Sequence, residues 1–485
     1  MKRNVMNSSA ATIHRILGEA IASIDSLKAE ACAQQVYQLY VSLSAADRLT
    51  FLRVLASDYG VDTNGIVQLS QLISTTQDRS SANFVKLQER LRLALLPRYQ
   101  QLFIQIGRLK GGVKLLVDIR AEVLQMLTTN GFDAEHHPQL RSLYGSLKDL
   151  LSMWLSVSSL KIEKVLRSSS PELLHKISEY EAVHPIKSEV DLRWRLGSYR
   201  RCYVFTHMCL PDEPIVVLHT ALTNEISSNI QAIVEPVQQN GHKSESENPS
   251  NINTAIFYSI TSTQKGLQGI EHGNNIIKQA VSALRTEFPH MHQFASLSPI
   301  PGFKDWLIDL MNKQKHMEEV AEHPSTVLFS KTELSQFSQC IPKSMSQTIF
   351  EDLRKCLLDN SWLMLKGIPE LLKEPLIRLC VKYLYIEKRR GYPINPVANF
   401  HLKNGAVLWR LNWLGDNSRR GLNASCGIMA NYCYFVNPIE ILEENSKKYM
   451  QDKKIEVSEE ILHYVEQIRA IDVEYEEQKQ TFCTL

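Results

Sequence analysis

The first 165 or so residues of the chain repeat apolar side chains at helical spacing, and this constrains the fold more than any other feature. One leucine-rich segment follows a capping-box pattern at Ser44 and Asp47 and ends at Gly60, and a second runs from Ala82 to Leu96. Helical hairpins joined by short turns satisfy this pattern, because each helix buries its apolar face against a neighbour. We therefore predict a helical domain over residues 1–165, with a helical-repeat scaffold as the alternative arrangement.

The pattern changes near Pro185, where β-branched and aromatic residues become frequent. Strands are predicted for residues 200–208, 215–222 and 255–260, for the segment that contains His401, and for residues 406–413 after an Asn404-Gly405 hairpin turn. Helices are predicted for residues 273–288 and for most of residues 303–390. Strands mixed with helices after an all-helical start predict an α+β fold class, with an α/β or α+β domain over residues 166–450.

Two polar segments complete the predicted layout. Residues 238–253 are polar and poor in aromatic side chains, which favours a surface loop. Residues 452–480 are heavily charged with a loose helical period, so the last segment, residues 451–485, is predicted to be a solvated C-terminal helix.

Charge and cysteine usage exclude several function classes. The 485-residue chain has a formal net charge of +2, which gives no reason to expect a nucleic-acid partner. No apolar run approaches the roughly 18 to 20 residues that span a bilayer, so no membrane span is predicted. The nine cysteines are scattered without a Cys-x-x-Cys pair or zinc-ligand spacing, which predicts reduced thiols and no metal site. The basic, Ser- and Ala-rich N-terminus is similar to a transit peptide, whereas the C-terminal Cys-Thr-Leu departs from the peroxisomal Ser-Lys-Leu signal.

A serine in a rigid backbone stands in the stretch Ser296-Leu-Ser-Pro-Ile-Pro-Gly-Phe303. Each proline fixes its own φ and disfavours helix at the preceding residue, so Ser298 is expected to be extended and its hydroxyl to be aimed. Taken alone, such a serine is most often a turn cap, and His401 is most often a packed strand histidine. A serine hydrolase is discounted, because the chain has no Gly-x-Ser-x-Gly elbow.

Longer motifs point to a family. They are Tyr199-Arg-Arg-Cys-Tyr203, Ser227-Ser-Asn-Ile-Gln-Ala-Ile233, Gln264-Lys-Gly-Leu-Gln-Gly269, the Ser296 to Phe303 stretch, Asn395-Pro-Val-Ala-Asn-Phe-His401, Asn404-Gly-Ala-Val-Leu-Trp-Arg410 and Ser425-Cys-Gly-Ile-Met-Ala-Asn-Tyr432. Together they resemble the malonyl-CoA decarboxylase family over residues 140–445. The resemblance implies a helical oligomerisation domain, a catalytic domain with the GNAT-type acetyltransferase fold, and conversion of malonyl-CoA to acetyl-CoA and carbon dioxide in the control of fatty-acid metabolism.

The resemblance also implies site residues. Ser298 and His401 match the catalytic pair, Glu271 matches a functional acid, and Tyr434 matches a tyrosine that supports the site. Contacts to CoA are implied for Gln268, Gly269, Ile270, Glu271, His272, Gly273 and Asn274, together with Ser298 and His401. Glycines in this segment let backbone N–H groups approach a phosphate, and the start of a helix adds a favourable dipole. By itself the segment is a weak motif, and an ordinary strand-to-helix turn is the alternative.

The implied reaction explains which groups are needed. Losing carbon dioxide from a malonyl thioester leaves an enolate, so the site needs donors at the thioester oxygen and a proton source for the α-carbon. Because the thioester carbonyl accepts the electrons, no cofactor or metal is predicted. A histidine that titrates near neutrality suits the proton transfer, and a neighbouring hydroxyl suits binding of the carboxylate or a proton relay.

Partners and rival functions follow from the same reasoning. The basic clusters Lys388-Arg389-Arg390 and Arg419-Arg420 are candidates for the CoA phosphates, with solvated surface as the alternative. The expected partners are malonyl-CoA and further copies of the chain, as a homo-oligomer such as a tetramer. The expected compartment is the mitochondrial matrix or the cytoplasm, with the peroxisome as a third possibility. The rivals are an acyltransferase, which needs an amine site, and an inactive acyl-CoA-binding or scaffold protein.

Overall fold

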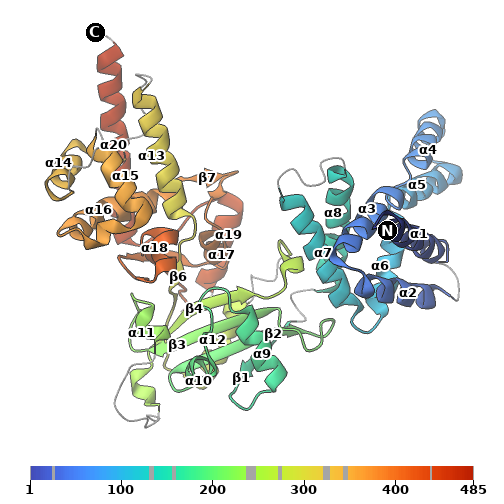
Figure 1. The fold of residues 1–485 in the computed structure, drawn as a ribbon, viewed down its shortest axis with the longest axis horizontal. Coiled ribbons are helices and arrows are strands. Elements are labelled where there is room, and N and C mark those ends of the chain that lie inside the picture. Colours follow the sequence, from blue (N-terminus) through green and yellow to red (C-terminus); the bar gives the residue numbers. More distant parts are fainter. Residues whose placement is uncertain are drawn as a thin grey trace. The chain divides into compact units, whose positions relative to one another are not determined.

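The computed structural model describes residues 2–23, 28–129, 136–155, 160–235, 247–270, 276–319, 328–341, 348–436 and 440–483 of the chain (Figure 1). The chain forms two compact units. The helical unit consists of residues 1–161, 205–216 and 262–272, and the sheet unit consists of residues 162–204, 217–261 and 273–485. The predicted fold class, a helical N-terminal region followed by a mixed region, is confirmed.

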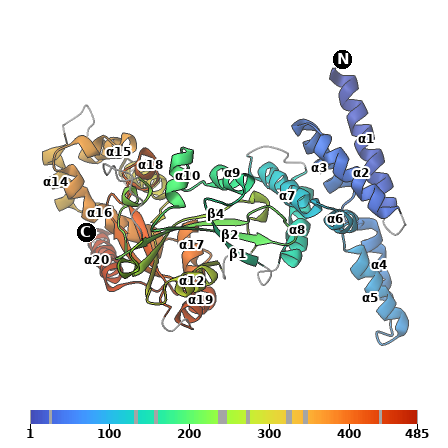
Figure 2. The same cartoon turned by 90° about the horizontal axis from the view of Figure 1, so that it is seen from below.

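Helices make up the N-terminal part of the helical unit. They are α1 (Lys2–Ala22), α2 (Ala29–Ser42), α3 (Ala45–Asp58), α4 (Thr63–Thr75), α5 (Ala82–Ala94), α6 (Tyr99–Arg108), α7 (Gly112–Thr128) and α8 (His137–Trp154). Ser44, Asp62 and Ser81 cap α3, α4 and α5, since each side chain accepts a backbone N–H three residues on. Helices α4 and α5 pack against each other and extend from the remaining helices of the unit as a hairpin (Figure 2).

One mixed sheet organises the rest of the chain. Its strands are β1 (Leu160–Val165), β2 (Arg200–His207), β3 (Val216–Thr223), β4 (Thr254–Ser262), β5 (Gln293–Ser296), β6 (Ser298–Pro299), β9 (Val407–Asn412) and β10 (Met429–Cys433). The order is β1-β2-β3-β4-β5-β10-β6, and β9 also pairs with β10. Strands β4 and β5 are parallel, whereas β10 is antiparallel to β5, β6 and β9. The predicted strands at residues 200–208, 215–222, 255–260 and 406–413 are thus confirmed.

Helices cover both faces of this sheet. Helices α9 (Pro171–Tyr180) and α10 (Glu189–Arg195) lie on one side, and α12 (Ile276–Glu287) lies on the other (Figure 2). Ile177 and Leu192 of α9 and α10 pack on Val204 and Val217 of β2 and β3. The remaining helices are α11 (Gln231–Val234), α13 (Phe303–Glu319), α14 (Lys331–Cys340), α15 (Ile349–Asp359), α16 (Ile368–Val381), α17 (Pro396–Lys403), α18 (Arg419–Ser425), α19 (Glu440–Asp452) and α20 (Glu459–Cys483).

The two polar segments differ in outcome. The C-terminal helix exists as α20, but its first half is not simply solvated, because Ile461, Val465 and Ile468 are buried. Of the predicted surface loop, residues 238–253, residues 238–246 lie outside the described residues, and the remainder contains the 3₁₀ helix η2 (Pro249–Asn251). No helix of the described part of the chain is both long enough and apolar enough to cross a membrane.

Candidate active site

The serine side of the site lies where β10 changes its pairing partner. Strand β5 ends at Ser296 and β6 begins at Ser298, and β10 runs antiparallel to both, with Ala430 opposite Ser298. Pro299 and Pro301 disfavour helix at the residues before them, so Ser298 is extended, as predicted. The Ser298 side chain is buried.

His401 lies on helix α17, so the prediction that it lies in a strand was wrong. The Asn395 side chain accepts the Ala398 N–H at 2.8 Å, and Pro396 occupies the first turn. An asparagine cap followed by a proline is a helix start signal, because the cap satisfies a free N–H and proline has none to lose. This start outweighs the β-like composition of the segment and places His401 near the C-terminal end of the helix.

The prediction of a hairpin turn at Asn404-Gly405 was also wrong. A type I′ turn needs positive φ at both central residues, but Asn404 has a φ of −84° and only Gly405, at 80°, is left-handed. Gly405 instead follows Asn404, the C-cap of α17, and a Cβ there would lie 2.0 Å from the Leu442 carbonyl oxygen. Two successive positive φ angles occur at Arg390 and Gly391, at 55° and 84°, between β7 (Lys388–Arg389) and β8 (Tyr392–Pro393).

One buried asparagine links the two halves of the site. Besides capping α17, Asn395 donates from Nδ2 to the Pro301 carbonyl oxygen at 3.0 Å. The Tyr383 hydroxyl donates to the same oxygen at 2.9 Å. The turn after Ser298 and the helix that carries His401 are therefore held together by neutral hydrogen bonds within the protein interior.

These elements bring Ser298 and His401 into contact. Ser298 Oγ lies 2.8 Å from His401 Nε2, and Tyr434 Oη lies 2.6 Å from His401 Nδ1. Ser298 donates its own hydroxyl hydrogen to Ser296 Oγ at 2.8 Å. Because that hydrogen is used, Nε2–H donates to Ser298 and Nδ1 accepts from Tyr434. Ser296, Ser298, His401 and Tyr434 thus form one chain of hydrogen bonds. Three of them, Ser298, His401 and Tyr434, are predicted site residues.

The environment of His401 keeps its imidazole neutral. Burial lowers the pKa of His401 to about 3, because an imidazolium would lose its hydration there. The Tyr432 ring stacks on the imidazole with a centroid distance of 4.5 Å and an interplanar angle of 16°. The expectation of a group that titrates near neutrality is therefore not met in the free protein. A neutral imidazole that donates from Nε2 is suited to stabilise negative charge that develops beside it.

The predicted CoA segment is described only in its first part. After the 3₁₀ helix η3 (Lys265–Leu267), Gln268 has φ −56° and ψ 131°, Gly269 has φ 75°, and the Ile270 N–H donates to the Leu267 carbonyl at 3.0 Å. These values define a type II turn, whose third residue needs positive φ and therefore favours glycine. Glu271, His272, Gly273 and Asn274 lie outside the described residues, so their roles stay predictions.

The basic clusters are differently engaged. Arg420 Nη1 donates to the Ala182 and Val183 carbonyls at 2.7 and 3.0 Å, so its guanidinium is already used within the fold. Lys388 and Arg389 are exposed on β7. A role in phosphate binding stays a prediction for both clusters.

Sequence reasoning missed three residues of the site, namely Ser296, Asn395 and Tyr432. Signals for two of them were present. Asn395 precedes a proline, which is a helix start signal, and Tyr432 stands two positions from Tyr434, so the two share one face of their strand segment. Ser296 carried no separate signal, because its role depends on the orientation of the Ser298 hydroxyl.

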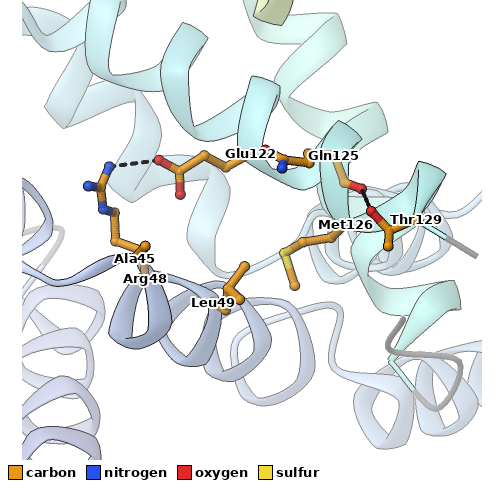
Figure 3. A pocket seen from close by; sticks show the side chains of 7 residues that line it. All are labelled: Ala45, Arg48, Leu49, Glu122, Gln125, Met126 and Thr129. Carbon is orange, nitrogen blue, oxygen red and sulfur yellow. Dashed lines mark hydrogen bonds and ion pairs between the residues drawn. The ribbon is translucent and has the colours of Figure 1, made fainter. Parts of the chain in front are cut away.

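A separate cavity of about 460 Å³ lies between α3 and α7 in the helical unit (Figure 3). It is lined by Ala45, Arg48, Leu49, Glu122, Gln125, Met126 and Thr129. Arg48 and Glu122 form an ion pair with an N–O distance of 2.8 Å, and Tyr40 donates to Glu122 at 2.9 Å. The two opposite charges neutralise each other, so the cavity does not resemble an anion site. Within the described ranges, no three His, Cys, Asp or Glu side chains are arranged to hold a metal ion.

Buried His219 of β3 predicts sensitivity to acid. Neither ring nitrogen has a hydrogen-bond partner among the described residues, although Nε2 lies 3.5 Å from the buried Glu181 carboxylate. Burial outweighs the attraction of that carboxylate and lowers the pKa of His219 to about 4. Between pH 6.5 and 4 the unfolded chain binds the proton that the folded chain excludes, so the free energy of unfolding falls as pH falls. We expect a loss of ~2 kcal/mol from this group at pH 5 relative to pH 7.5. Thermal melts of the wild type and of His219→Phe at both pH values test this, and an equal decrease in Tm for both proteins would contradict it.

Comparison with known proteins identifies the family. The protein-family model described as the malonyl-CoA decarboxylase C-terminal domain matches residues 159–475 of the sequence. The family model described as the malonyl-CoA decarboxylase N-terminal domain matches residues 59–155. The chain belongs to the malonyl-CoA decarboxylase family. The resemblance seen in its motifs is thereby confirmed, and the family accounts for both the helical and the mixed region.

Curated members and solved structures of the malonyl-CoA decarboxylase family align over most of the chain. The mitochondrial enzymes of Anser anser anser and Rattus norvegicus are 42% and 43% identical to it. These alignments cover 91% and 88% of this chain and 84% and 83% of the relatives. Crystal structures of malonyl-CoA decarboxylase from Rhodopseudomonas palustris and Agrobacterium vitis match with TM-scores of 0.75 and 0.74 at 28% identity. They cover 93% of this chain, and 98% and 99% of the solved chains.

Proposed function

We propose that this protein converts malonyl-CoA to acetyl-CoA and carbon dioxide without a cofactor, with Ser298 and His401 as its catalytic residues. Family membership supports the reaction. The observation that carries the assignment of residues is the 2.8 Å contact between Ser298 Oγ and His401 Nε2, which joins side chains 103 positions apart. A hydroxyl in hydrogen-bond contact with an imidazole is the geometry expected of a catalytic pair, and these two residues are the pair that the family motifs indicate, which supports the assignment.

The proposed step breaks the bond between the carboxyl carbon and the α-carbon. Carbon dioxide leaves, and the bonding electrons pass to the α-carbon and the thioester oxygen as an enolate. In this step the Ser298 hydroxyl turns from Ser296 Oγ to the thioester oxygen, while the Nε2–H of His401 continues to donate to Ser298 Oγ. The pair then delivers the proton that replaces the carboxylate, so each turnover consumes one solvent proton. Burial raises the pKa of Tyr434 well above its usual value, which keeps Tyr434 a neutral donor to His401. Charge is then stabilised by oriented hydrogen bonds in a low-dielectric site.

Binding of CoA is proposed for residues 268–274, with Glu271 as a functional acid. The type II turn at Gln268 and Gly269 supports this, because such a turn exposes a backbone N–H that can meet a phosphate oxygen. The parallel pairing of β4 with β5, on either side of this segment, supports the GNAT-type fold that the motifs imply.

The test is product release from malonyl-CoA by purified protein without added metal. Acetyl-CoA and carbon dioxide in equal amounts are the expected result. Binding of malonyl-CoA without turnover would favour the inactive binding protein, and products that require an added amine would favour the acyltransferase.

We propose that the helical domain, residues 1–165, forms the subunit contacts of a homo-oligomer, with a tetramer as the expected size. Large apolar side chains exposed on α4 and α5 and at the two positions after α5 support this. They are Val67, Leu72, Val85, Leu93, Leu95 and Leu96, with exposures between 41% and 61%. A hairpin that extends from its unit with this many exposed apolar groups is suited to pack against another copy.

A charged double variant tests the hairpin. Leu72→Glu with Leu93→Glu is expected to lower the mass seen by light scattering, because two carboxylates would be buried unpaired in the contact. The fold should survive, because both side chains are exposed, at 50% and 61%. Leu462→Glu on α20, where the leucine is 43% exposed, is the matched control and should leave the mass unchanged. A double variant with wild-type mass would contradict this role.

We propose a mitochondrial location, because the curated relatives from Anser anser anser and Rattus norvegicus are named mitochondrial. Ile13 and Leu17 of α1 are buried in the helical unit, so cleavage of a leader beyond them would remove part of a folded core. Import of the full chain into isolated mitochondria tests the location. Exclusion from mitochondria would instead favour the cytoplasm or the peroxisome.

A further inference from the structure

Arg120 is a fully buried cation that the proposed reaction does not use. It lies on α7 in the helical unit with an exposure of 0%. Its guanidinium donates from Nη1 to the Gly266 carbonyl and from Nη2 to the Gln268 carbonyl, the latter at 2.9 Å. The Tyr144 ring lies 4.2 Å from the guanidinium carbon. Burying a charge is unfavourable unless the charged group is well hydrogen-bonded. The two carbonyl groups that Arg120 binds therefore indicate the role of this side chain.

The loop that Arg120 holds is packed directly on the backbone of α7. A Cβ at Gly266 would lie 1.8 Å from the Val117 carbonyl oxygen, so only glycine fits there. The Tyr144 hydroxyl also approaches the Gln268 carbonyl, at 3.5 Å. The start of the predicted CoA segment is thus held on α7 by the close contact of Gly266 with the helix backbone and by the two hydrogen bonds of the Arg120 guanidinium.

The hydrogen bond to Gln268 determines the orientation of one peptide group. In a planar trans peptide the carbonyl and the following N–H point in opposite directions. Because Arg120 binds the Gln268 carbonyl, the Gly269 N–H points away from the guanidinium. Gln268 and Gly269 are exposed, and among the described residues the Gly269 N–H has no hydrogen-bond partner. A flip of this peptide would convert the type II turn to a type I turn and would reverse the N–H.

We propose that Arg120 is a positioning residue that holds the Gln268–Gly269 peptide so that the Gly269 N–H donates to the diphosphate of CoA. The proposal rests on the proposed function, in which residues 268–274 bind CoA. Arg120 does not touch the ligand. It acts through the turn, and its fork of donors suits this because it can hold two carbonyls in one fixed geometry.

The test compares a substrate that carries the diphosphate with one that lacks the whole 3′-phosphoadenosine diphosphate group. Kinetics of the wild type, Arg120→Lys and Arg120→Leu are measured with malonyl-CoA and with malonyl-pantetheine, which lacks the diphosphate. Both variants are expected to raise KM for malonyl-CoA about tenfold, the loss expected for one hydrogen bond to a charged group, with kcat within about twofold. KM for malonyl-pantetheine should not change. Arg48→Leu is the control, because Arg48 also binds α7, through its ion pair with Glu122 (Figure 3), whereas Arg120 is the arginine that binds the loop.

A second variant covers the case in which the Arg120 variants fail to fold. Gly269→Ala should fold, because its Cβ would meet no atom within 4 Å, yet it disfavours the φ of 75° that the turn needs. It should show the same selective rise in KM for malonyl-CoA. An equal rise in KM for both substrates, or none for either, would overturn the role of Arg120.

Failure of the proposed function is distinguishable from failure of this inference. If the wild type does not decarboxylate malonyl-CoA, the proposed function fails. Calorimetric binding of CoA and of pantetheine then tests Arg120 independently. Weaker binding of CoA alone in the Arg120 and Gly269 variants supports its role, and unchanged or equally weakened binding of both contradicts it.

Discussion

Replacing His401 with asparagine is expected to lower kcat for malonyl-CoA by about a hundred- to ten-thousand-fold, the usual contribution of a positioned acid–base group. Asparagine is polar and fits the buried space, but it cannot link Tyr434 to Ser298 as the two ring nitrogens do. KM should change little, because the imidazole acts on charge that develops during the reaction. Steady-state kinetics of carbon dioxide release measure the effect.

The matched control for this change is another buried histidine of the same unit. His219→Phe keeps a ring against Tyr258, which stacks on His219 at a centroid distance of 5.9 Å. It should retain kcat while it changes the stability of the fold in acid. Tyr434→Phe removes only the donor to Nδ1 and should lower kcat about tenfold, in keeping with one lost hydrogen bond. Retention of most activity in the His401 variant would remove His401 from the mechanism.

Replacing Ser298 with alanine is expected to lower kcat by about a hundred- to a thousand-fold, as does the loss of one oriented donor to a developing oxyanion. Ser298 Oγ is the atom that contacts both His401 Nε2 and Ser296 Oγ, so its removal separates the imidazole from Ser296 and leaves it bonded to Tyr434 alone. Equilibrium binding of malonyl-CoA should be preserved, and this distinguishes loss of catalysis from loss of binding.

Ser296 provides the matched control for the serine change. Ser296→Ala removes a hydroxyl of the same size two residues away, which accepts from Ser298. We expect a loss of about tenfold, because the Ser298 hydroxyl loses its acceptor. The Tyr432 N–H, which also donates to Ser296 Oγ at 3.3 Å, loses the same acceptor. If Ser296→Ala were as damaging as Ser298→Ala, Ser296 would be more than a support for Ser298, and the assignment of Ser298 as the catalytic hydroxyl would be wrong.

Periodicity predicted the long elements well and the short helix at the site poorly. The helical spacing before residue 155 and the β-branched runs that form β2, β3 and β4 carry strong local signals, and these elements formed as expected. Helix α17 has only eight residues, which is too few for a helical repeat of apolar side chains to be recognised. Its caps carry the information instead, and Asn404-Gly405 is compatible with both a helix end and a hairpin.

The motifs and periodicity of the chain were enough to predict the family, the order of a helical region before a mixed one, and Ser298, His401 and Tyr434 as candidate site residues. These inferences rest on local patterns and motifs, which need no knowledge of distant contacts. Three features required the folded structure: His401 lies on a helix, Asn395 connects that helix to the serine turn, and burial keeps the imidazole neutral. The role proposed for Arg120 also depends on the folded structure, because the carbonyl groups that its guanidinium binds lie 146 and 148 positions away in the sequence. Burial, pKa and long-range hydrogen bonds depend on which residues the fold brings together, and no local pattern in the chain contains that information.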